Sequence, residues 1–95
     1  MSDNRVFEWD DAKALSNLAK HRIEFPYATA VFLDPRRVDL DVSRAEDREA
    51  RRKSVGLFEG RLLTVIYTVR GGVTRIISAR RSNTTEGKAY GPLHA

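Results

Sequence analysis

The sequence predicts an α+β fold with one mostly antiparallel sheet, two N-terminal helices and a short C-terminal helix. Two hairpin turns, at Glu59-Gly60 and Gly71-Gly72, join three segments that alternate like strands. Apolar residues near the N-terminus recur with helical spacing instead, and capping residues appear near the C-terminus. Because 95 residues suit one compact domain and leave no room for two, we expect residues 1–95 to share one core.

The N-terminal segment is expected to form a short strand over residues 5–9 and then a helix. Asp10 can cap that helix, because a carboxylate accepts from the free amides of the first turn, and the helical pattern continues to His21. At about 100° per residue, the apolar side chains gather on one side of the helix: Ala12, Leu15, Leu18 and Ala19. The polar side chains gather on the opposite side, where we expect solvent: Asp10, Lys13, Asn17, Lys20 and His21.

The middle of the chain predicts a second helix and a strand. Pro26 suits the first turn of a short, mostly buried helix, which Asp34-Pro35 ends. Residues 38–42 then alternate between apolar and acidic side chains, which is the period of a half-buried strand. Residues 43–49 are so polar that we expect a loop or a frayed extension there.

The C-terminal half predicts an antiparallel meander followed by a helix. The expected strands span residues 51–58, 61–70 and 73–81. Asn83 and Glu86 have the spacing of a capping box, and the helix that they begin ends at Gly91-Pro92. Gly87 makes this helix weak by itself. The predicted order, β-α-α-β-β-β-β-α, gives a sheet with helices packed on it.

Composition excludes several classes of protein. The absence of cysteine removes disulfide frameworks and thiolate zinc sites, and the two histidines, His21 and His94, are too far apart in sequence to suggest a metal. The N-terminus lacks a basic segment followed by an apolar run, and no stretch is long and apolar enough for a membrane span. We therefore expect a cytoplasmic protein without cofactor or metal. A net charge of +4 and a pI near 9.9 point moderately to a nucleic acid.

The polar side of the first helix is the first candidate site. Lys13, Asn17 and Lys20 could meet a phosphate backbone there, although a merely solvated face is the simpler alternative. His21 could exchange protons near neutral pH while Lys20 holds a phosphate. Equally, His21 could only satisfy the helix C-terminus.

The last predicted strand is the second candidate. Simple alternation puts Arg75 and Arg80 on opposite faces, so at most one of them would share any single site. Arg80 ends this strand where the last helix begins, whereas Arg75 could instead pair with Asp39 or Asp41 across the sheet.

A third basic cluster, Arg51 to Lys53, begins the strand expected over residues 51–58, although such a run usually only solvates a surface. No phosphate-binding glycine loop, nucleophile elbow or pair of metal carboxylates is recognisable. An enzyme built from these residues would use Arg, Lys and His, with Glu86 and Tyr90 as further candidates. Such groups suffice for metal-independent RNA cleavage, in which a base activates the ribose 2′-hydroxyl, cations stabilise the phosphorane and an acid protonates the leaving oxygen.

Taken together, these motifs resemble those of the BrnT family of toxins. The resemblance is carried by FEWD at residues 7–10, by the residues Lys13, Asn17 and Lys20-His21, and by RIISAR ending at Arg80. It extends from Val6 to Tyr90. Further matching positions are Phe25, Ala30, Phe32, Asp34, Arg51 and Gly56.

The resemblance implies a RelE-like fold and a ribonuclease toxin of a type II toxin–antitoxin pair. It implies RNA as the substrate and, as partner, a ribbon-helix-helix antitoxin of the BrnA type in a 2:2 assembly, with DNA contacted only through the antitoxin. The polar set that the family pattern favours is Lys20, His21, Arg51, Arg75, Arg80, Glu86 and Tyr90. Among these and the first-helix residues, we assign catalysis to Lys20, His21, Arg80, Glu86 and Tyr90. RNA binding is assigned to Lys13, Asn17, Arg51 and Arg75.

Two departures from the family pattern leave alternatives open. Arg52-Lys53 stand where apolar strand residues are expected, and the last helix is poor in basic residues and helix formers. The weak last helix leaves open an inactive family member, and the lack of a canonical nucleophile leaves open a non-catalytic module that binds nucleic acid or antitoxin.

Overall fold

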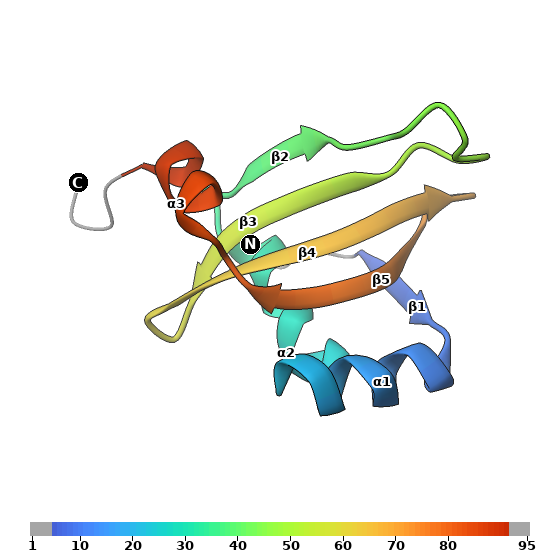
Figure 1. Cartoon of the computed structure of the whole chain (residues 1–95), viewed down its shortest axis with the longest axis horizontal. Coiled ribbons are helices and arrows are strands. Elements are labelled where there is room, and N and C mark those ends of the chain that lie inside the picture. Colours follow the sequence, from blue (N-terminus) through green and yellow to red (C-terminus); the bar gives the residue numbers. More distant parts are fainter. Residues whose placement is uncertain (1–4, 92–95) are drawn as a thin grey trace.

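The computed structural model describes residues 5–91, which form a five-stranded mixed sheet with helices on both faces (Figure 1). Helices α1 and α2 lie below the sheet in this view, and α3 lies above it. The elements follow one another as β1 (Val6–Trp9), α1 (Asp11–His21), α2 (Phe25–Ala28), the 3-10 helix η1 (Thr29–Leu33), β2 (Val38–Asp41), β3 (Arg52–Phe58), β4 (Arg61–Arg70), β5 (Val73–Arg81) and α3 (Thr84–Tyr90). The predicted order of elements is confirmed, although the second predicted helix is one turn of α-helix continued by η1.

The strands lie side by side in the order β1-β5-β4-β3-β2. The three pairings from β2 to β5 are antiparallel, whereas β1 runs parallel to β5, so the sheet is mixed. The hairpin between β4 and β5 turns through Gly71 and Gly72, whose φ angles are +51° and +81°. Both angles are strained for other residues, which explains the Gly-Gly pair.

The core lies between the sheet and the first two helices. Strand β4 contributes Leu63, Val65 and Tyr67, all nearly inaccessible to solvent, and Phe25 and Val31 cover them from α2 and η1. The close approach of η1 to β3 requires Gly56, because a Cβ there would lie 2.8 Å from Val31 Cγ1. The opposite face of the sheet is covered at one end by α3 and is otherwise open.

A β-bulge in β5 corrects the predicted alternation of Arg75 and Arg80. Thr64 pairs with Arg80 and Thr68 with Arg75, but the register shifts by one residue between these two pairs. Because β4 itself stays regular, Thr64 and Thr68 point to the same face, away from the core. Arg75 and Arg80 therefore share the open face, and the prediction that they point oppositely was wrong because an extra residue restores the phase.

The orientation of α1 also differs from the prediction. The side chain of α1 that is buried is Asn17, at 7% exposure, whereas Leu15 is 70% exposed and Leu18 and Ala12 also face solvent. Asn17 donates to Ala79 O at 2.8 Å and to Ile23 O at 3.0 Å, and accepts from Ala79 N at 3.1 Å. Since β1 pairs with β5 only as far as Ile76, Ala79 lies on a strand edge whose backbone groups need these partners. The amphipathic spacing of α1 could not predict that Ala79 needs these hydrogen-bond partners.

Candidate RNA-binding groove

A shallow hollow lies where α1 meets the free edge of β5. Its volume is about 260 Å³, and it combines three of the predicted residues, Lys13, Lys20 and His21, with the strand residues Ile77 and Ser78. Asn17 and Ser16 complete the lining. Within residues 5–91, no side-chain hydrogen bond or ion pair engages the Lys13 ammonium, the Lys20 ammonium or the His21 ring. These three groups are therefore available to a ligand.

A second hollow of about 200 Å³ continues from the first, because Lys13 and Ile77 line both. It brings in Arg51 and Arg75, which were also predicted as RNA-binding residues. The remaining lining residues are Asp47, Arg48, Glu49, Thr68 and Arg70. We call the two hollows together the basic groove. The two hollows adjoin at Lys13 and Ile77, so the basic groove extends from His21 to the loop between β2 and β3.

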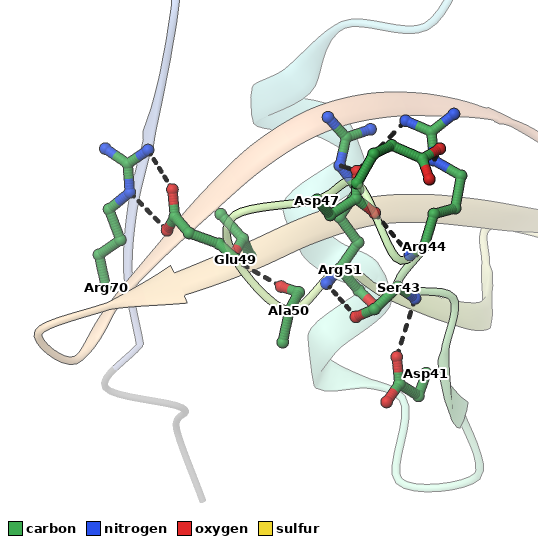
Figure 2. Close-up of polar contacts among 10 residues, drawn as sticks. Asp41, Ser43, Arg44, Asp47, Glu49, Ala50, Arg51 and Arg70 are labelled. Atoms are coloured by element: carbon green, nitrogen blue, oxygen red, sulfur yellow. Dashed lines mark hydrogen bonds and ion pairs between the residues drawn. The ribbon is translucent and has the colours of Figure 1, made fainter.

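The wall of the basic groove is the loop of residues 42–51, which local polar contacts hold in place (Figure 2). Arg51 N donates to Ser43 Oγ at 2.7 Å, and Arg44 N donates to Asp47 at 2.7 Å. A hydrogen bond also joins the loop to strand β4, since Thr68 Oγ1 donates to Ala50 O at 2.8 Å. The very polar segment predicted as a loop is thus ordered by its own polar side chains.

The charges of the groove wall are partly neutralised within the protein. Arg70 forms a bidentate ion pair with Glu49, and these two hydrogen bonds lower the pKa of the Glu49 carboxyl. Arg51 lies 3.7 Å from Asp47. The Arg70–Glu49 pair is exposed to solvent, at 57% and 37%, so it is weak and can open when a phosphate competes for the guanidinium. Asp47 is only 6% exposed, so its pair with Arg51 is more sheltered from solvent.

Arg75 pairs with a different residue from those predicted. Its Nη1 lies 3.1 Å from Glu8 on the neighbouring β1, not beside Asp39 or Asp41. Asp39 instead accepts from Arg52 at 2.5 Å and from the Tyr67 hydroxyl, on the face of the sheet that carries the core. Burial, followed by the bond to Asp39, raises the pKa of Tyr67 to about 12. This pairing explains why Arg52 can stand where an apolar residue was expected.

Arg80 and Glu86 form a separate cluster beneath α3. Glu86 is 1% exposed and accepts two bonds of 2.8 Å from Arg80, one of 2.9 Å from Lys53 and one of 2.9 Å from Thr64. The predicted capping box adds a bond from the Asn83 amide. The Arg80 guanidinium, assisted by Lys53, holds the pKa of Glu86 far below its ordinary value, so Glu86 stays ionised and is unsuited to proton exchange near neutral pH.

Tyr90 lies apart from both the groove and the Glu86 cluster. Its hydroxyl donates to Asp34 Oδ2 at 2.6 Å, and this bond raises the pKa of Tyr90. Asp34 also accepts from Leu57 N at 2.8 Å, so the pair ties α3 to the end of η1 and to β3. Of the nine predicted residues, the basic groove therefore brings together six: Lys13, Asn17, Lys20, His21, Arg51 and Arg75.

Several residues of the groove were not predicted. Arg70, Arg48 and Glu49 were missed because only the folded hairpin carries Arg70 to the loop. The partnership of Lys53 with Glu86 gave no signal beyond an unexpected charge in a strand. Among residues 5–91, no group of three or more His, Asp or Glu side chains could hold a metal ion; His94 lies outside the described residues. None of the helices in that range is long and apolar enough to cross a membrane.

Comparison with known proteins agrees with the resemblance noted in the sequence. The family model described as the ribonuclease toxin BrnT of a type II toxin–antitoxin system matches residues 9–86. This range contains the whole basic groove and the Glu86 cluster. No curated protein matches the chain.

Proposed function

The chain belongs to the BrnT family of ribonuclease toxins of type II toxin–antitoxin systems, and we propose that it is a metal-independent endoribonuclease that cuts RNA in the basic groove. The single observation that carries this proposal is that the two hollows adjoin: His21 and Lys20 share one hollow with Lys13, which also lines the hollow of Arg51 and Arg75. An RNA backbone laid along this path meets Lys20 and the His21 ring at one end, and Arg51 and Arg75 at the other.

The proposed reaction is attack of a ribose 2′-hydroxyl on the adjacent phosphorus. The oxygen–phosphorus bond to the next nucleotide breaks, which leaves a 2′,3′-cyclic phosphate and a free 5′-hydroxyl. His21 transfers the proton between the reacting oxygens, because its imidazole, the only one among the described residues that line the groove, can both accept and donate a proton. Lys20 stabilises the negative charge that develops on the phosphorane.

We propose different roles for the other predicted residues. Asn17 supports the groove floor, since its amide is already fully used by backbone groups. Arg80 and Glu86 position α3 over the sheet, and Tyr90 fastens α3 at its other end. We assign the chain a RelE-like fold, a cytoplasmic site of action and a BrnA-type ribbon-helix-helix antitoxin in a 2:2 complex, with DNA bound only through that antitoxin.

The test is incubation of the purified protein with RNA in EDTA. We expect cleavage that persists in EDTA, yields 2′,3′-cyclic phosphate ends and stops when the nucleotide at the cut carries no 2′-hydroxyl. His21→Ala and Lys20→Ala should each lower the rate by about 10²-fold or more. Lys88→Ala, which removes an exposed lysine of α3 outside the groove, serves as the matched control.

Three outcomes would refute parts of this proposal. Binding of RNA without cleavage would favour the non-catalytic module, and neither binding nor cleavage by a folded protein would favour an inactive member. Cleavage that is lost on Arg80→Ala but survives His21→Ala, with both variants folded, would move the reaction to the Glu86 cluster.

A further inference from the structure

A mostly apolar groove lies on the other side of α1 from the basic groove. Ala14, Leu15 and Leu18 of α1 face Phe25 and Pro26 of α2 across a hollow of about 320 Å³. We call this hollow the apolar groove. Its only charged lining residues within the described chain are Asp11 and Glu24.

The apolar groove results from the way α1 packs. Because Asn17 is the residue that α1 turns toward β5, the leucines on the opposite side of the helix contribute little to the core. Leu15 is 70% exposed, and it lies beside other apolar side chains. A contiguous apolar surface left in contact with water is unfavourable. The predicted apolar side of the helix is therefore real, but nothing within residues 5–91 covers it.

The charges of the groove identify the kind of partner that fits. The chain has a net charge of +4, yet both charged residues of this lining are acidic. A second copy docked by a two-fold axis would bring two Asp11 and two Glu24 carboxylates together, which is repulsive. A basic partner segment is attracted instead. An amphipathic helix presents an apolar stripe flanked by cations, which matches an apolar hollow whose lining includes two carboxylates.

We propose that the apolar groove is the docking site of the antitoxin, which seats an amphipathic helix with an apolar stripe flanked by Lys or Arg against Leu15 and Leu18. This proposal rests on the proposed function, because a type II toxin requires a protein antitoxin. Helix α1 then has two binding sides. Lys13, Lys20 and His21 line the basic groove, and the antitoxin helix anchors on the opposite side of the same helix, which holds the rest of the antitoxin beside the RNA path.

The test compares two matched variants by their affinity for the purified antitoxin encoded beside this toxin. Leu15→Lys places a cation in the apolar groove, and Leu33→Lys makes the same change at a residue that is 62% exposed at the end of η1, outside the groove. We expect Leu15→Lys to weaken binding by at least about tenfold and Leu33→Lys to leave it unchanged. Both residues are exposed, so circular dichroism and thermal unfolding should match the unmodified protein.

Removing one acidic group of the rim tests the charge of the partner. Glu24 makes no side-chain capping bond to α2, so Glu24→Gln should leave the fold intact. We expect it to weaken antitoxin binding by about threefold at low salt and to reduce the salt dependence of the affinity.

Three results would overturn the proposal: equal antitoxin affinity for Leu15→Lys and Leu33→Lys, tighter binding by Glu24→Gln, or a toxin dimer that Leu15→Lys dissociates while antitoxin binding persists. The last result would assign the groove to a second copy of this chain. Because affinity is measured without RNA, the outcome is independent of whether the chain cleaves RNA.

Discussion

Glu86→Gln is the substitution that most directly tests how α3 is held. The change keeps the shape of the side chain but removes the negative charge that meets Arg80 and Lys53. Glu86 is buried and accepts hydrogen bonds from four residues in all, since Thr64 and Asn83 also donate to it. We therefore expect the substitution to lower stability and not to remove a catalytic acid or base.

The size of this loss follows from the exposure of the partners. Breaking a buried ion pair by removing one member costs about 3–5 kcal/mol. The Arg80 and Lys53 side chains are 29% and 20% exposed, so water can partly replace the lost carboxylate, and Gln keeps one acceptor oxygen. We therefore expect a loss of about 2 kcal/mol, which corresponds to a fall in Tm of roughly 8–16 °C for a domain of this size.

The assay is urea unfolding followed by circular dichroism, repeated between pH 7 and pH 3. The pKa of Glu86 is lower in the folded state than in the unfolded chain, so its contribution is complete above the unfolded value of about 4.5 and is lost as the pH falls below it. The difference between the two proteins should therefore shrink on acidification. Glu49→Gln, which breaks an exposed pair with Arg70, should cost less than about 1 kcal/mol. A Glu86→Gln protein as stable as Glu49→Gln would refute this account of the cluster.

Three further substitutions test other parts of the structure. Asn17→Leu keeps the branched shape of the side chain but leaves Ala79 N and O unpaired, so it should lower the free energy of unfolding by about 2–4 kcal/mol in urea titrations; a neutral effect would contradict the role of Asn17 at the strand edge. Gly56→Ala forces a Cβ against Val31 and should cost about 1–3 kcal/mol by the same measurement, and unchanged stability would show that η1 can move away. Lys13→Ala, at the junction of the two hollows, should reduce the slope of log affinity for RNA against log salt by about one, and an unchanged slope would exclude Lys13 from phosphate contact.

Local patterns predicted most of the secondary structure correctly because their causes are local. Asp10 accepts from Lys13 N at 3.1 Å, and Asn83 and Glu86 exchange both bonds of the capping box, as their spacing indicated. The two turns fixed the ends of β4 and β5, since a Gly-Gly pair or a turn residue with positive φ is needed where the chain reverses. In each case, the residues that determine the geometry lie within four positions of one another.

The bulge in β5 shows what such patterns cannot contain. RIISAR reads equally well as a regular strand, and the extra residue is visible only when the strand is paired with the regular β4. One residue of shift changed the face of Arg80 relative to Arg75. Even so, the two arginines are separated by four residues of β4, about 14 Å at the usual rise, so sharing a face does not place them in one site. Arg75 lines the basic groove and Arg80 holds Glu86.

The orientation of α1 follows from a competition that hydrophobic spacing alone does not describe. Burying Leu15 and Leu18 would gain about 1.5–3 kcal/mol each, but the edge of β5 would then keep the amide and carbonyl of Ala79 without partners. Asn17 satisfies both groups and also the carbonyl of Ile23, so one polar side chain replaces the strand that β1 is too short to provide. In this orientation, Lys13 and Lys20 of α1 line the basic groove, and Leu15 and Leu18 remain exposed to solvent. If β1 were long enough to pair with Ala79, α1 could bury its leucines in place of Asn17. The exposure of Leu15 and Leu18 is therefore a consequence of the burial of Asn17.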